Sequence, residues 1–228
     1  MSAHRPCLQR FATIAEIERR MEDTDPTSWL SPAERGVWTG MRSPARRLQY
    51  VAGRWLAREL LSEAARSEGE DPVADAWEIA SRDARGHAMR PRITHGGRHL
   101  PWSLSISHSD DAVLVAVSTR PGTNVGVDLV PMRALGRGFA ATWFTAHERA
   151  WCGDGEDPWR ASAIWAVKEA LYKAAGGGDP FVPNNWPVST TTENTVALGL
   201  SVGDASVRLR RLCGHVAAVV ICESEEAA

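Results

Sequence analysis

The spacing of apolar residues changes several times along this chain, and this change limits the folds that it can adopt. Up to about residue 65, and again from about 145 to 175, apolar residues recur every three or four positions, as on one face of a helix. Between about 77 and 130, and after 196, they alternate or form short β-branched runs, which is typical of strands. Successive blocks of helices and strands predict an α+β fold.

Local signals mark where the predicted helices begin and end. Ser31-Pro32-Ala33-Glu34 and Thr145-Ala146-His147-Glu148 have the pattern of capping boxes. Ser43-Pro44 places a cap and a first-turn proline before a long helix. Another helix is predicted from Trp159 to Ala175 and ends at Gly176-Gly177-Gly178, which is no phosphate loop because no Gly-Lys-Ser/Thr follows it.

Strands are expected in two groups, one in each half of the chain. The expected strands are Trp77–Ile79, Leu104–Ser107, Ala112–Val117, Val125–Val130, Val196–Leu200, Val207–Leu212 and Val216–Ile221. Because the helix-then-strand order occurs twice, we expect two similar halves, residues 1–122 and 123–228, joined near the turn Arg120-Pro121-Gly122.

Composition excludes several classes of protein. The 228 residues carry a formal net charge of −2, so no overall basic field favours nucleic acid or lipid. No apolar run is long enough to span a bilayer, and the N-terminal residues lack the apolar core of a signal peptide, so a cytoplasmic protein is expected. The four cysteines form no C-x-x-C pair, which favours small buried side chains in a reducing compartment.

The two lysines, among 26 basic residues, both fall in the predicted helix 159–175. Glu169 and Lys173 are four residues apart and project side by side, which by itself indicates a surface ion pair. Lys168 lies at the edge of the apolar arc, so its ammonium must reach water or meet an anion. Lysine persisting in an arginine-rich chain is a pointer to chemistry that needs a compact ammonium, and the alternative is chance.

An aspartate interrupts the apolar run Gly126-Val127-Asp128-Leu129-Val130. A buried carboxylate needs a cation, a donor or a metal ion, because desolvation of an unpaired charge is costly. Asp128 with one further carboxylate and phosphate oxygens would suit Mg²⁺. The alternative is an aspartate that caps a turn at the end of a strand.

Ser105-Ile106-Ser107-His108-Ser109 ends a predicted strand with several hydrogen-bonding groups. Ser107 and His108 can offer hydroxyl, amide and imidazole donors to phosphate. A catalytic Ser-His-Asp triad is a poor interpretation, because sequence neighbours do not reach the relay geometry. The alternative is an ordinary turn after a strand.

Arginines form a further candidate site. Arg47, Arg54 and Arg58 share one side of the long predicted helix, and Arg90-Pro91-Arg92 precedes the serine-histidine strand. Such a stripe is usually a solvated helix face, although guanidinium groups are also well suited to phosphate.

Taken in order, these elements closely resemble the Sfp-type 4′-phosphopantetheinyl transferases, over about residues 31–222. The matching motifs are R-x-x-Y-V-A-G-R (Arg47–Arg54), R-P (Arg90, Pro91), SISHS (Ser105–Ser109), GVD (Gly126–Asp128) and WAVKEALYK (Trp165–Lys173). The resemblance implies two similar α+β halves with a coenzyme A cleft between them. It also implies transfer of the phosphopantetheine arm to a serine of an apo acyl or peptidyl carrier protein, with release of 3′,5′-ADP.

The resemblance also implies roles for individual residues. Asp128 and Glu169 would hold Mg²⁺, with Mn²⁺ as a possible substitute, and Glu169 and Lys173 would be catalytic. The residues expected to bind coenzyme A are Arg46 or Arg47, Arg54, Arg90, Ser107, His108, Asp128 and Lys173. Helix periodicity favours Arg47 over Arg46. Glu169 or a metal-bound water would accept the serine proton, and Lys173 would stabilise the leaving phosphate.

One position departs from the family pattern. Many relatives carry a glutamate two residues after the motif aspartate, where this chain has Val130. Valine cannot coordinate a metal, so we expect a water or another carboxylate to complete the metal shell, with Asp110 and Asp111 as weak candidates.

Two other functions remain open: a non-catalytic module that binds coenzyme A or a carrier protein, and a metal-dependent phosphoesterase. A monomer is expected, because one chain supplies both halves of the site. The segment Met132–Phe144 is expected to contact the carrier. Carriers of fatty acid, polyketide and nonribosomal peptide synthesis are all compatible with the sequence.

Overall fold

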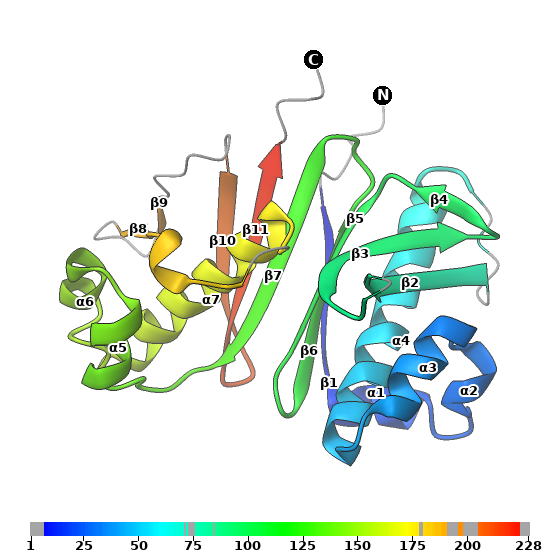
Figure 1. The fold of residues 1–228 in the computed structure, drawn as a ribbon, viewed down its shortest axis with the longest axis horizontal. Helices are drawn as coiled ribbons and strands as arrows, with labels where there is room; N and C mark the ends of the chain where they lie inside the picture. Colours follow the sequence, from blue (N-terminus) through cyan, green and yellow to red (C-terminus); the bar gives the residue numbers. More distant parts are fainter. Residues whose placement is uncertain are drawn as a thin grey trace. The chain divides into compact units, whose positions relative to one another are not determined.

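The computed structural model describes residues 7–70, 72, 76–83, 85–177, 180–190, 196–197 and 205–223. Helices and antiparallel sheets are combined, which confirms the predicted α+β class. The chain divides into two compact units, Met1–Pro121 and Gly122–Ala228. Figure 1 shows the order of the elements along the chain.

The first unit is built around one long helix. Its sheets have the strand orders β1-β6-β5 and β2-β3-β4, and all their pairings are antiparallel. The strands are β1 (Leu8–Thr13), β2 (Trp77–Arg82), β3 (Ala88–His95), β4 (Arg98–Leu100), β5 (Ser103–His108) and β6 (Ala112–Ser118). The helices are α1 (Ile14–Arg20), α2 (Pro26–Trp29), α3 (Pro32–Gly40) and α4 (Pro44–Ser67).

Helix α4 begins where the sequence predicts and packs on the first sheet. The Ser43 side chain accepts a hydrogen bond from the backbone N–H of Arg46, and Pro44 occupies the first turn. Gly53 lies close to β5, since a Cβ there would be 3.1 Å from the Ile106 side chain. The buried face of α4 and the inner face of β6 thereby share one apolar core.

The second unit has the sheet order β10-β11-β7, with α7 across one face (Figure 1). Its main elements are β7 (Thr123–Pro131), α5 (Arg137–Trp143), α6 (Ala146–Trp151), α7 (Pro158–Ala175), β10 (Ala205–Leu212) and β11 (His215–Glu223). Short elements follow α7: η2 (Pro183–Asn185), β8 (Ser189–Thr190) and β9 (Val196–Ala197). Gly176 ends α7 with a left-handed backbone, φ 118°.

Most predicted elements are present, but some were not expected. Strands β1, β3 and β4 and helices α2 and α5 lacked a clear sequence signal. Residues 198–200 and Gly178, at the ends of a predicted strand and of the glycine run, lie outside the described residues. Burial of the cysteines is confirmed for Cys152 and Cys222, but Cys213 is exposed. Within the described residues, no helix is both long and apolar enough to cross a bilayer.

Candidate active site

Helix α7 lies unusually close to strand β7 at Gly126. A Cβ at this position would be 1.9 Å from the carbonyl oxygen of Ala170 and 2.6 Å from the backbone nitrogen of Ala174. Such distances are far below van der Waals contact, so only glycine allows this approach. Because strand side chains alternate, Asp128 is on the same face as Gly126 and therefore faces α7.

Asp128 meets a lysine from that helix. Its carboxylate is buried in the middle of β7, and its Oδ1 is 2.7 Å from the Nζ of Lys173. The same ammonium donates to the carbonyl oxygen of Val127, 3.1 Å away. The cation that the sequence required for this buried carboxylate is thus present. The alternative of an aspartate capping a turn is wrong.

Glu169 faces the same ammonium from its own helix. Its Oε2 is 3.9 Å from the Nζ of Lys173, so this nitrogen lies within 4 Å of carboxylate oxygens from both β7 and α7. Both Glu169 and Lys173 retain just over a quarter of their side-chain exposure. The structure therefore brings together Asp128, Glu169 and Lys173, the three residues of the predicted reaction centre in this unit.

The surroundings of Glu169 change its acidity. Burial, helped by the nearby charge of Asp128, raises the pKa of Glu169 to about 7. Lys173 and a hydrogen bond with Trp165 act in the opposite direction. A carboxyl group with a pKa near neutrality is well matched to accepting a proton at physiological pH.

The oxygen donors of this cluster fit a magnesium ion. Two carboxylates, those of Asp128 and Glu169, already face the ammonium of Lys173. Mg²⁺ is usually bound by one or two protein carboxylates, and phosphate oxygens and water occupy its other positions. Val130 adds no ligand, since its side chain belongs to the apolar cluster under α7 together with Ala163 and Val216. No three His, Cys, Asp or Glu side chains gather as metal ligands among the described residues.

Lys168, one residue before Glu169, has a different environment. It is fully buried, and its Nζ is 2.8 Å from Glu148, 3.1 Å from the carbonyl oxygen of Pro183 and 2.9 Å from that of Trp186. Burial lowers the pKa of Lys168, and the hydrogen bond and charge of Glu148 oppose this shift. The predicted anion is present. The lysine links α6, α7 and the segment after it, so its persistence has a structural reason.

Glu148, the buried partner of Lys168, also accepts hydrogen bonds from two backbone N–H groups. Its carboxylate accepts from the backbone N–H of Thr145, 2.7 Å away, which closes the capping box of α6. It also accepts from the N–H of Val188, at 2.7 Å. The sequence motif shows the capping role of this glutamate, but not its pairing with Lys168.

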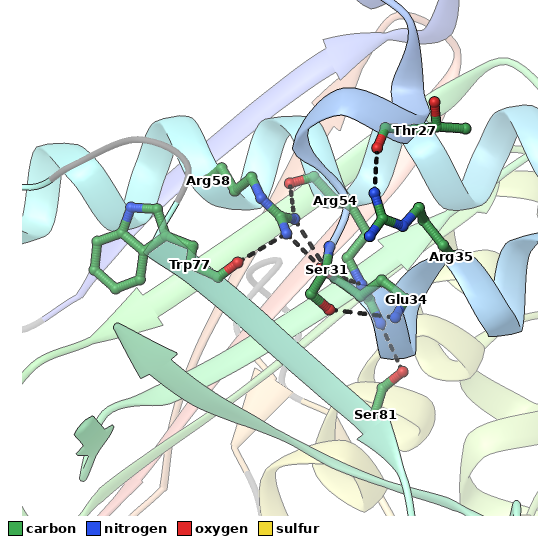
Figure 2. Close-up of polar contacts among 8 residues, drawn as sticks. All are labelled: Thr27, Ser31, Glu34, Arg35, Arg54, Arg58, Trp77 and Ser81. Atoms are coloured by element: carbon green, nitrogen blue, oxygen red, sulfur yellow. Dashed lines mark hydrogen bonds and ion pairs between the residues drawn. The ribbon is translucent and has the colours of Figure 1, made fainter. Parts of the chain in front are cut away.

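In the first unit, two of the candidate arginines point inward to one glutamate, as Figure 2 shows. The Nε of Arg54 is 3.2 Å from Oε1 of Glu34, and Arg58 donates to both oxygens of the same carboxylate. Arg54 also donates to Ser81 Oγ at 2.6 Å, and Arg58 to the carbonyl oxygen of Trp77 at 3.0 Å.

All three charged side chains of this Glu34 cluster are less than a tenth exposed. The interpretation of the arginine stripe as a solvated face is therefore wrong for Arg54 and Arg58. Binding of a nucleotide by Arg54 stays a prediction, although Glu34 and Ser81 already engage its guanidinium group.

Arg46 and Arg47 lie in the first turn of α4, and both are exposed. Arg47 donates to the carbonyl oxygens of Met41 and Thr39, at 2.6 and 3.1 Å, and its guanidinium lies 5.8 Å from the ring centre of Trp38. These contacts direct the Arg47 side chain back toward the end of α3.

Ser107 and His108, the predicted phosphate-binding residues, lie at the end of β5. Ser107 is buried and His108 is exposed, and both belong to the last residues of the strand. Gln49 of α4 donates to the carbonyl oxygen of Ser109 at 3.1 Å and so ties the end of β5 to the helix. Gln49 was not among the predicted site residues. The only feature of the sequence that marks it is a polar side chain one turn before Gly53. Arg90 lies on β3, which packs against β5.

The match to a protein-family model falls in the second unit. Residues 124–222 match the family model of the 4′-phosphopantetheinyl transferase superfamily. This segment contains Asp128, Glu169 and Lys173 and covers less than half of the chain. No curated protein matches the chain.

Solved structures with detectable similarity include three acyl carrier protein synthases. The protein from Bacillus anthracis, in complex with CoA (3′,5′-ADP), is 25% identical over 49% of this chain and 92% of that chain, with a TM-score of 0.36. The Neisseria meningitidis protein is 21% identical over 49% and 94%, with a TM-score of 0.37. The Mycobacterium tuberculosis protein is 25% identical over 44% and 96%, with a TM-score of 0.34.

Proposed function

We propose that this chain transfers the 4′-phosphopantetheine arm of coenzyme A to a serine hydroxyl of an apo carrier protein and releases 3′,5′-ADP. The observation that carries the proposal is the convergence of Asp128 and Glu169 on the ammonium of Lys173. The family match over residues 124–222 supports it, because all three residues fall in the matched segment.

Each residue of the cluster has a part in this reaction. The serine oxygen attacks the phosphorus that bears the pantetheine arm, and the bond from that phosphorus to the oxygen of 3′,5′-ADP breaks. Glu169 accepts the serine proton. Lys173 places a positive charge beside the leaving phosphate, where negative charge grows. The protein thus contributes positioning and charge rather than a covalent intermediate.

Asp128 and Glu169 would hold Mg²⁺ or, as a substitute, Mn²⁺. When bound, the ion neutralises charge on the diphosphate of coenzyme A. With Val130 in place of a third carboxylate, water and phosphate oxygens are proposed to complete its shell.

The first unit is proposed to bind the nucleotide end of coenzyme A. Ser107 and His108 would contact phosphates, and Arg46 or Arg47, together with Arg90, would meet the 3′-phosphate. Arg54 remains in this proposed set, although its contacts with Glu34 and Ser81 favour a role in orienting α4.

The finer assignments are also proposals. The order of motifs favours the Sfp-type branch, with acyl or peptidyl carrier proteins as partners. Residues 132–144 are proposed to lie near the carrier. A cytoplasmic monomer is proposed as well, because the N-terminal residues lack the apolar core of a signal peptide and one chain supplies both halves of the site. Pathways that make polyketides, nonribosomal peptides or fatty acids all supply carriers with the required serine.

A transfer assay tests the proposal. The protein is incubated with coenzyme A, Mg²⁺ and a panel of apo acyl and peptidyl carrier proteins, and each carrier is weighed by mass spectrometry. We expect at least one carrier to gain the mass of one phosphopantetheine arm, with 3′,5′-ADP in equal amount.

Two results would overturn it. Binding of coenzyme A with no mass gain on any carrier would leave a non-catalytic binding module. Release of free phosphopantetheine without a carrier would show a phosphoesterase.

A further inference from the structure

The ammonium of Lys173 lies against the carboxylate that the proposed reaction needs for a metal ion. Its Nζ is 2.7 Å from Asp128 Oδ1, which is the distance of a strong charge-assisted hydrogen bond. The same nitrogen also lies 3.1 Å from the carbonyl oxygen of Val127 and 3.9 Å from Glu169 Oε2. The chain itself therefore supplies a cation to its acidic pair.

The charges near this point do not favour a second cation. Asp128 and Glu169 carry at most two negative charges, and Lys173 cancels one of them. Val130 belongs to the apolar cluster under α7, so the position two residues after Asp128 adds no further charge. A divalent ion entering beside the ammonium of Lys173 would be repelled by it, and within this cluster at most one net negative charge would remain to attract the ion.

Lys173 is able to leave this position, unlike the other lysine of α7. Its side chain is 28% exposed, and its four-carbon stem is flexible. Lys168 is fully buried and bound to three oxygens, one from α6 and two from the segment after α7, so it is fixed. Lys173 is therefore placed to exchange the carboxylate of Asp128 for another anion, such as a phosphate oxygen.

We propose that Lys173 is the resident counter-ion of Asp128 in the free protein, and that it moves to a diphosphate when one binds. Asp128 then becomes available to a divalent ion only together with the diphosphate, so free protein binds the metal weakly. This inference rests on the metal site of the proposed function. It adds that metal and diphosphate bind cooperatively, with the lysine as the coupling element.

The test is a titration of the free protein with Mn²⁺ alone, without nucleotide, in which unbound Mn²⁺ is measured by electron paramagnetic resonance. We expect Lys173→Met and Lys173→Gln each to lower the Kd for Mn²⁺ by about tenfold or more relative to the unmodified chain. Lys173→Arg keeps the charge and should leave the Kd within about threefold. Arg160→Met removes an exposed positive charge from the same helix and should have no effect. Thermal melts verify that each variant is folded.

A second substitution locates the bound ion. Adding Asp128→Asn to the Lys173→Met variant should abolish the gain in affinity. The inference is overturned if the neutral variants bind Mn²⁺ no more tightly than the unmodified chain, or if the gain survives Asp128→Asn. Neither result depends on carrier modification. If no carrier is modified but the Lys173 variants bind Mn²⁺ more tightly as expected, only the proposed function is refuted. If a carrier is modified but the variants do not bind Mn²⁺ more tightly, only the inference is refuted.

Discussion

The two lysines of α7 lie five residues apart and show how differently one helix can use the same side chain. Lys168 is buried against Glu148 and two carbonyl oxygens. Lys173 is partly exposed and faces Asp128 and Glu169. The buried lysine donates its hydrogen bonds to groups of α6 and of the segment after α7, and so joins these parts of the unit. The partly exposed one lies between a buried carboxylate, Asp128, and a partly exposed one, Glu169. The exposure of each lysine and the groups it contacts, rather than the residue type, distinguish the structural lysine from the one proposed to take part in the reaction.

The largest expected effect concerns the partly exposed cluster. Glu169→Gln should reduce carrier modification by about a thousandfold or more, because the amide neither accepts the serine proton nor supplies a charged metal ligand. Initial rates of carrier modification measure the effect. The control is Glu156→Gln, an exposed glutamate of the same unit, whose rate should stay within twofold. Near-normal turnover of Glu169→Gln would remove this residue from the catalytic set.

The buried lysine should instead affect stability. Lys168→Met leaves the carboxylate of Glu148 buried without its ammonium, so the free energy of unfolding should fall by about 3–5 kcal/mol. Urea denaturation measures this change. Arg160→Met, which removes an exposed ion pair of the same helix with Asp157, should cost about 0.5 kcal/mol or less. Equal effects of the two variants would refute the distinction between the buried and exposed positions.

The close approach at Gly126 affects the surroundings of both lysines, because it sets how near α7 lies to β7. Gly126→Ala places a Cβ against the backbone of Ala170, so α7 must shift outward. We expect a loss of about 1–3 kcal/mol in unfolding free energy and a clear fall in transfer rate. Gly36→Ala, in helix α3 with no atom near the added methyl, is the control and should be neutral or slightly stabilising. Tolerance of Gly126→Ala in both assays would show that the contact is unimportant.

The last expected effect is a pH dependence of stability. Since the pKa of Glu169 is about 7 in the folded chain and near 4.5 when unfolded, the folded state retains a proton between these values that the unfolded state has lost. This contribution is therefore largest at low pH and is lost as pH rises toward 7.

In metal-free buffer, Glu169→Gln should gain stability relative to the unmodified chain between pH 5 and pH 8, by about 1–3 kcal/mol. Urea melts at several pH values measure this difference. A difference that does not vary with pH would contradict the raised pKa.

Much of the fold and the reaction centre follows from local sequence patterns. Capping boxes and the changing apolar period predict α3, α6, α7 and the central strands, because these signals act within a few residues. The four-residue spacing of Glu169 and Lys173 predicts their proximity, and a carboxylate in an apolar strand predicts a partner for Asp128.

The missed features depend on contacts between distant residues. The inward turn of Arg54 and Arg58 requires Glu34, which lies on a separate helix. The edge strand β1 exists through its pairing with β6, about a hundred residues later. Only the packed structure shows that the glycine of the GVD motif admits α7 to the face of β7.

The central claim is that Asp128 and Glu169 serve one divalent ion. The most direct measurement is an anomalous difference map from crystals grown with Mn²⁺ and coenzyme A. It should show one strong peak within coordination distance of a carboxylate oxygen from each residue, with the ammonium of Lys173 turned to the diphosphate. A manganese peak away from either carboxylate, or none beside the bound diphosphate, would contradict the account.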